Sequence, residues 1–120
     1  MDTPGIAFLH ALYEHLGVPV VTKVPRDRPD TFVRVDFGSG RATSPASEDR
    51  LVAVQVYSTH PNTATALIFK ARMFLLESIC TVSPKILWWE EQAGPHEWAD
   101  PDIPAVTRWQ ITGNVTLTLT

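Results

Sequence analysis

The sequence predicts an α+β protein: an antiparallel sheet of about four strands with two helices on one face, in the order α-β-β-α-β-β. Apolar and polar residues alternate strictly from Arg108 to Thr120, which is typical of one long strand with a single buried face. Shorter alternating segments lie at Val33–Phe37 and Leu51–Tyr57, and apolar residues recur at helical spacing in two other segments. Because the strands come in pairs and do not alternate with helices, the class is α+β.

The first element is predicted to be a helix. Thr3 is a suitable N-cap, Pro4 suits the first helical position, and Gly17 suits the end. Between them, apolar residues form one stripe at helical spacing: Ile6, Leu9, Leu12, Tyr13 and Leu16. The segment that follows, Val18–Pro29, is interrupted by three prolines and is predicted to be extended.

The next two strands are predicted to pair as a hairpin with a long loop. In Val33–Phe37 the apolar residues alternate with Arg34 and Asp36, whereas Leu51–Tyr57 is apolar on both faces. Residues 38–49, between them, are rich in glycine and serine and poor in apolar residues, which favours a flexible loop.

A second helix is expected from a cap at Asn62 or Thr63 to about Cys80. Its core stripe is Leu67, Ile68, Ala71, Phe74, Leu75 and Ile79. A second apolar stripe lies on the other side of the helix: Phe69, Met73, Leu76 and Cys80. Two interpretations are open. The helix lies between the sheet and the first helix, or the second stripe packs against a neighbouring subunit.

The C-terminal third is predicted to contain the other two strands. The third strand is Ile86–Glu91, and residues 92–104 form an acidic, turn-rich connection to the final strand. At roughly 3.3 Å per residue the final strand would span on the order of 40 Å, about twice the usual length. A strand of this length offers more surface than the core of a small domain needs, which points towards assembly.

Composition predicts a single domain, residues 1–120, because 44% apolar content in 120 residues is enough to bury a core. A net charge of −3 gives no global attraction to nucleic acid or to anionic lipid. The charge is nevertheless uneven, since residues 86–120 contain only Arg108 as a base against five acidic residues. No apolar run is long enough for a membrane span, and Met1–Pro4 does not look like the start of a signal peptide.

The residues suited to chemistry form no recognisable active site. His10 and His15 are five residues apart, which places them poorly for a shared metal on a helix. Gly38-Ser39-Gly40 resembles the start of a phosphate loop but lacks the following Lys-Ser/Thr. Cys80 lies on an apolar stripe and is expected to be a small buried hydrophobe. We therefore expect no catalytic residue, no metal and no cofactor.

Several motifs taken together resemble the tail terminator (tail completion) proteins of long-tailed bacteriophages, particularly phages of actinobacteria. In chain order the motifs are Val33–Gly40, Glu48–Tyr57, Ala64–Ile79, Gly94-Pro95, Asp100–Pro104 and Arg108–Thr112. The resemblance covers most of residues 25–119 in order and spacing. One departure is Thr120, because the resemblance leads us to expect a basic residue after the last strand.

The resemblance implies a structural virion protein that forms a ring, commonly a hexamer, at the neck end of the tail. Such a ring caps the tail tube, ends its polymerisation and provides the joint to the head connector, and it assembles in the cytoplasm of the bacterial host. The implied partners are further copies of the chain, the tail tube protein and the connector or neck protein. DNA is only passing cargo, and no membrane is involved.

Three sets of residues are candidates for these contacts. The subunit-interface candidates are Phe69, Met73, Leu76, Trp109, Leu117 and Leu119. The candidates for axial contact, within the expected loop, are Arg41, Glu48, Asp49 and Arg50. The candidates for negative charge along a channel are Glu90, Glu91, Glu97, Asp100 and Asp102, because like charge repels the phosphates of DNA.

Two other interpretations stay open. A head–tail joining or neck protein would share the fold class and the ring. A small dimeric α+β enzyme or ligand-binding module belongs to a different class, and it would use His10, Glu14 or His60 to line a pocket.

Overall fold

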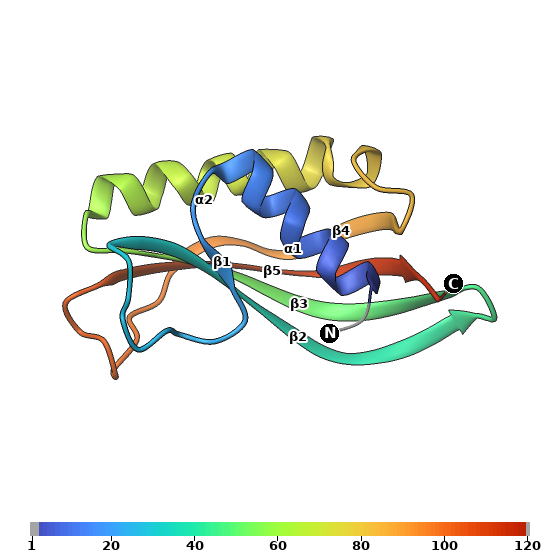
Figure 1. Cartoon of the computed structure of the whole chain (residues 1–120), viewed down its shortest axis with the longest axis horizontal. Coiled ribbons are helices and arrows are strands. Elements are labelled where there is room, and N and C mark those ends of the chain that lie inside the picture. The colour runs from blue at the N-terminus through green and yellow to red at the C-terminus, as the bar shows by residue number, and fades with distance from the viewer. Residues whose placement is uncertain (1–2, 120) are drawn as a thin grey trace.

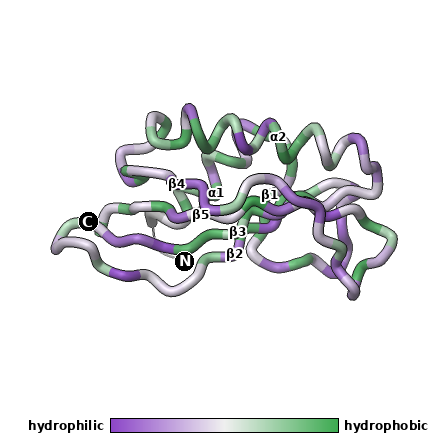
Figure 2. The backbone as a smooth tube through the Cα atoms, turned by 180° about the vertical axis from the view of Figure 1, so that it is seen from behind, coloured by the Kyte–Doolittle hydropathy of each residue, from purple (hydrophilic) through white to green (hydrophobic). Residues whose placement is uncertain are grey.

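The computed structural model describes residues 3–119 and confirms the α+β class (Figure 1). The elements are, in chain order, α1 (Thr3–Leu16), β1 (Val20–Val21), β2 (Thr31–Ser44), β3 (Ser47–Ser58), α2 (Pro61–Glu77), a 3-10 turn (Ile79–Thr81), β4 (Ile86–Glu97) and β5 (Thr107–Thr118). In this described part, five strands form one sheet in the order β1-β2-β3-β5-β4, with both helices on one face (Figures 1 and 2). The four long strands are antiparallel as expected, whereas the short β1 pairs parallel with β2 and was not expected.

Helix α1 ends where the sequence predicts but buries a different line of residues. Gly17 has a φ of +71°, a left-handed conformation that glycine adopts readily, and its N–H donates to the carbonyl of Tyr13 at 2.9 Å. The buried line consists of Phe8, Leu12 and Leu16. Ile6 and Tyr13 of the expected stripe are exposed, so that prediction is only partly right. Apolar residues occur on more than one side of α1, and the edge-on packing of Phe8 against Phe37 selects the buried side.

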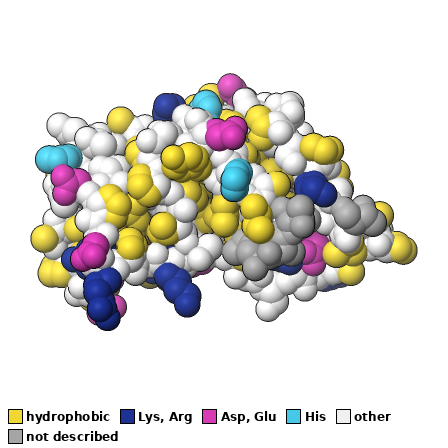
Figure 3. Space-filling view, in the orientation of Figure 1, with side chains coloured by type: hydrophobic (Ala, Val, Ile, Leu, Met, Phe, Trp, Pro, Cys, Tyr) yellow, Lys and Arg dark blue, Asp and Glu magenta, His cyan; other side chains and the backbone are white. Residues whose placement is uncertain are grey.

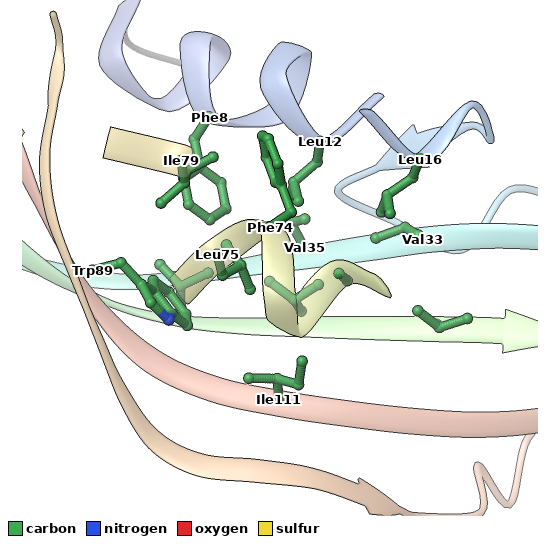
Figure 4. Packing of buried hydrophobic residues seen from close by; sticks show 14 of the residues in the cluster. Phe8, Leu12, Leu16, Val33, Val35, Phe74, Leu75, Ile79, Trp89 and Ile111 are labelled. Atoms are coloured by element: carbon green, nitrogen blue, oxygen red, sulfur yellow. The ribbon is translucent and has the colours of Figure 1, made fainter. Parts of the chain in front are cut away.

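The predicted core stripe of α2 is confirmed. All six residues are buried: Leu67, Ile68, Ala71, Phe74, Leu75 and Ile79. They belong to the main core, together with valines of β2 and β3 and Ile111 of β5 (Figure 4). The helix begins at Pro61, before the expected cap at Asn62 or Thr63, because His60 is extended and proline fits the first helical position.

The prediction of a loop at residues 38–49 is wrong. β2 continues to Ser44 and β3 begins at Ser47, so only Pro45 and Ala46 form the turn. The start of β3 is also paired on its other side with the end of β5, in the register Ser47↔Thr118 to Arg50↔Val115. This pairing supplies backbone hydrogen bonds that the local composition of the segment cannot reveal.

β4 is also longer than predicted. It runs to Glu97, so the turn-rich connection begins at Trp98 and not at residue 92. The pairing of β4 with β5 contains three register shifts, and Gly94 and Pro95 lie between Ala93 and His96 at one of them. Such irregularities tolerate turn-forming residues within a strand. The connection, residues 98–106, is called the strap below.

The alternation predicted for the last strand is confirmed from Ile111 to Thr118, and Thr120 lies outside the described residues. At the start of β5 the prediction is wrong, because Arg108 and Gln110 of the polar face are buried. Odd-numbered residues such as Ile111, Val115 and Leu117 face the helices and are fully buried. Gly113 lies on the same side, where a Cβ would come within 2.5 Å of the Trp89 indole ring. Glycine therefore lets Trp89 of β4 cross β5 closely.

The opposite face of the sheet, which we call the open face, is covered by the strap at one end. There Ile103 packs with Phe32 and Tyr57 in a small second cluster, and the two aromatic rings stack at 4.7 Å. Towards the turn of the β2–β3 hairpin the open face stays accessible, since Leu51 and Trp88 are both exposed. The two faces of the sheet therefore differ in character.

Candidate assembly surfaces

An apolar stripe on α2 is exposed to solvent. Phe69, Met73 and Leu76, which we call the outer stripe, are 44%, 50% and 51% exposed. Helix α1 does not cover them, because it packs against the other side of α2, where His15 stacks on Phe74 at 4.2 Å. Of the two interpretations left open by the sequence, burial of this stripe between sheet and first helix is therefore wrong.

The outer stripe lies on the side of α2 that faces β4. Arg72, the residue before Met73 on α2, reaches Glu91 of β4 through two hydrogen bonds of 2.9 and 3.0 Å. This hydrogen-bonded ion pair raises the pKa of Arg72. Phe69 lies 6.2 Å, centroid to centroid, from the partly buried Trp109 of β5. The apolar surface is therefore continuous from α2 to the sheet.

The candidates from the end of β5 have different environments. Leu117 is fully buried in the core of its own chain, so its assignment to a subunit interface is wrong. Leu119 is exposed, and its backbone N–H donates to the carbonyl of Ala46 at 2.9 Å. Strand alternation correctly places Leu117 on the apolar face but cannot show that the helices of the same chain already cover that face.

Three of the four axial candidates have partners within the chain. Arg50 pairs with Glu48 at 2.8 Å, and Asp49 accepts a hydrogen bond from the Thr116 hydroxyl at 2.7 Å. Arg41 is exposed and makes no ion pair with any residue between 3 and 119. Arg41 is thus the candidate of this set that remains available to a partner.

The acidic candidates do not form one acidic surface. Glu91 is paired with Arg72, and Asp100 is nearly buried, so neither is a free charge facing a channel. Glu90, Glu97 and Asp102 are exposed. The sequence shows the negative charge of this third of the chain but not the cations that α2 and β5 place beside two of the carboxylates.

Asp100 belongs to a polar network on the open face that the sequence did not predict. Arg108 donates to Gln55 and to the hydroxyl of Tyr57 at 3.2 Å each, and lies 3.7 Å from Asp100. The Tyr57 hydroxyl in turn donates to Asp100 at 3.1 Å. Arg108 also donates to the Trp98 carbonyl at 2.8 Å and stacks over its ring at 4.5 Å. These contacts fasten the strap to the sheet.

Arg34 and Asp36 of β2 extend this network towards the sheet edge. Asp36 accepts hydrogen bonds from Gln55 at 2.7 Å and from Arg34 at 3.1 Å. Burial lowers the pKa of Arg34, but the Tyr57 hydrogen bond and the charge of Asp36 outweigh it and raise the pKa. The only sequence signal for this network was the placement of Gln55 inside a strand that is apolar on both faces.

The hollows on the surface do not gather the residues proposed for catalysis. Glu14 lines a shallow hollow of about 240 Å³ with His15. His10 is exposed on α1, and His60 is exposed just before α2. Between residues 3 and 119 no three His, Cys, Asp or Glu side chains lie close enough together to hold a metal. No described helix is long and apolar enough to cross a membrane.

The fold has a counterpart among solved structures. A chain from a structure titled "Virion of native gene transfer agent (GTA) particle" superposes with a TM-score of 0.58 at 13% sequence identity. The match covers 89% of this chain and 84% of that chain. No protein-family profile matches this chain, and no curated protein sequence is significantly similar to it. At this identity the likeness shows a shared fold.

Proposed function

We propose that this chain is a structural protein of a phage-like particle and that its copies form a ring, as in a tail terminator. The observation that carries the proposal is the fold likeness over 89% of the chain to a component of a gene transfer agent virion. The sequence motifs that resemble tail terminators point in the same direction. Both lines concern most of the chain and not a single short motif.

Exposed apolar side chains support the assembly part of this proposal. The outer stripe places three large apolar side chains on the surface of a helix whose core face is fully used. Hydrophobic side chains also reach the surface in the side view of Figure 3, over the helix layer and over the sheet below it. Apolar surface rimmed by polar residues marks sites of protein association more often than it marks free surface. Closed cyclic symmetry converts one such patch and its complement into a finite assembly.

In the tail terminator role, the ring sits at the neck end of the tail, binds the last layer of tail tube protein and stops its polymerisation. Its other face provides the joint to the head connector. A hexamer is the expected stoichiometry, and assembly takes place in the bacterial cytoplasm before the ring becomes part of the virion. DNA passes through the channel and is not bound.

The experiment that tests this function combines the purified protein with tail tube protein of the same particle and, separately, with the head connector. Negative-stain imaging should show tubes with a density cap at one end, and tube growth should stop when the protein is added. Binding to the connector without binding to tubes would identify a neck protein instead. Absence of binding to both would contradict a structural role in the tail.

A further inference from the structure

We propose that copies of this chain join head to tail through the two edges of the sheet. In this joint, residues Val35–Ser44 of β2 in one copy pair with β4 of the next. The inference rests on the ring assembly of the proposed function and specifies the contact that closes the ring. The partner at each edge is a second copy of this chain.

Both sheet edges have free backbone groups. β2 is paired on its outer side with β1 only at Val33 and Arg34, so from Val35 to Ser44 no described strand lies on that outer side. β4 forms the other edge. Its pairing with β5 is regular only from Trp88 to Glu91, with one register shift before this segment and two after it. Free edges pair readily with another strand. On β4, the register shifts limit such pairing to the regular segment Trp88–Glu91.

The strand directions suit this contact. β2 pairs antiparallel with β3, β3 with β5, and β5 with β4, so β2 and β4 run in opposite directions at the two edges. A rotation about an axis roughly along the strands leaves these directions unchanged. β2 of one copy therefore meets β4 of the next as an antiparallel partner, and the contact is heterologous, as a closed ring requires.

Opposite charges lie at neighbouring levels of the two edges. Arg41 is paired with Asp49, Asp49 with Thr116, and Thr116 with Trp88, so Arg41 and Trp88 end the same row on the open face. Glu90 lies two residues further along β4, about 7 Å away on that face. Arg41 and Glu90 are exposed, and neither forms an ion pair within residues 3–119. The joint brings them within diagonal reach of each other.

The shapes of the two edges are also complementary. On β2, Gly38, Ser39 and Gly40 are exposed and present almost no side-chain bulk. On β4, Trp88 is 61% exposed at the adjacent level. The Trp88 ring of one copy thus faces the small residues of the next copy. Arg41 can lie against that ring, because the face of an aromatic ring attracts a cation.

The positions of the two helices are also compatible with a contact between the two sheet edges. The outer stripe lies on the β4 side of α2, since Arg72, next to Met73, reaches Glu91 of that strand. The end of α1 lies beside β1 at the β2 edge, while Phe8 packs between Phe37 of β2 and the Trp89 ring, which reaches over from β4. Joining the two edges therefore turns the outer stripe towards α1 of the next copy, which exposes Ile6 and Tyr13. Sheet and helix layers would both continue across the joint.

Charge reversal tests the joint in purified protein. Arg41→Glu and Glu90→Lys should each shift the ring towards monomer by tenfold or more in concentration, as measured by native mass spectrometry and light scattering. The double variant Arg41→Glu/Glu90→Lys should restore the ring because it restores opposite charges. Arg28→Glu and Glu14→Lys, matched charge changes at exposed positions elsewhere, should assemble like the wild type.

A mixture of the two single variants extends the test. In a ring with an even number of copies, alternating subunits bring the carboxylate introduced by Arg41→Glu against the ammonium introduced by Glu90→Lys at every second joint. The remaining joints keep the wild-type pair of Arg41 and Glu90. Mixing should therefore restore rings. Wild-type protein that stays monomeric, single variants that assemble normally, or a double variant that fails to assemble would each overturn the proposed joint.

Cross-linking gives a second measurement that does not depend on charge. With Cys80 replaced by serine, Arg41→Cys together with Trp88→Cys should give a ladder of disulfide-linked species that ends at the ring size. Either cysteine alone should give no ladder. These experiments need no tail tube, so a failed joint leaves the capping function open, and a confirmed joint without tube binding refutes the capping function alone.

Discussion

Individual polar residues on the open face hold the strap in place. Among the residues that the structure describes, Asp100 forms its ion pair with Arg108, and both side chains are about nine-tenths buried. Replacing one member of a buried pair leaves the other desolvated without its counter-charge. Asp100 therefore has a structural role, although the sequence suggested a charge facing a channel.

Asp100→Asn should lower the free energy of unfolding by about 1–3 kcal/mol, because Arg108 then remains buried without an anion. Asp102→Asn is the matched control, since Asp102 is exposed, and it should change stability by no more than about 0.5 kcal/mol. Urea denaturation measures both. Equal effects of the two substitutions would contradict the role of Asp100.

At the scale of the elements, α2 has two apolar faces with different surroundings. Its inner face is buried by the sheet and by α1, where Phe74 stacks on His15. Its outer stripe is exposed and borders Trp109 and the Arg72–Glu91 pair. Substitutions on the two faces should therefore affect different properties of the protein.

Phe74→Ala should lower the free energy of unfolding by about 3–5 kcal/mol, the range for aromatic side chains deleted from a core. Phe69→Asp should leave the subunit folded but unable to form rings, because a charge replaces part of the apolar contact. Lys70→Asp, at an exposed position outside the stripe, serves as the control for an added carboxylate. Circular dichroism and light scattering separate the outcomes, and an unfolded Phe69→Asp would place Phe69 in the core.

For the whole molecule, the arrangement of charge matters more than the net charge of −3. Figure 3 shows Lys and Arg side chains at the end of the molecule where residues 22–30 and the strap lie. Arg26 and Arg28 line a hollow of about 330 Å³ there together with Asp102. The negative charge of the C-terminal third is therefore partly offset in three dimensions, and exposed carboxylates such as Glu97 and Asp102 remain as candidates for repelling DNA.

Glu97→Lys together with Asp102→Lys should make the assembled ring retain DNA, with binding that weakens steeply as salt increases. Repulsion by these carboxylates acts only within roughly 8 Å at physiological salt, so their position in the ring decides the effect. Glu14→Lys with Glu77→Lys makes the same change in charge on the helices. Filter binding at several salt concentrations tests both. Equal DNA binding by the two variants would show that only net charge matters.

Local pattern alone determined much of this fold. Periodicity predicted both helices, the core stripe of α2 and the alternating faces of β5, because each side chain's direction follows from the helical or strand repeat. Gly17 marked the end of α1 because few other residues adopt its backbone conformation. Where an element has a single apolar side, the order of its residues predicts which side chains are buried.

Only the tertiary structure decided which surfaces are already occupied. Residues 38–49 looked like a loop because the stabilising partner, β5, is distant in sequence. Leu117 looked available because the core that buries it is built from elements distant in the chain. Glu91 and Asp100 looked free because their cations lie on α2 and β5. Pairing between strands and between charges depends on contacts distant in sequence, so the free edges of β2 and β4 became visible only when the sheet order was known.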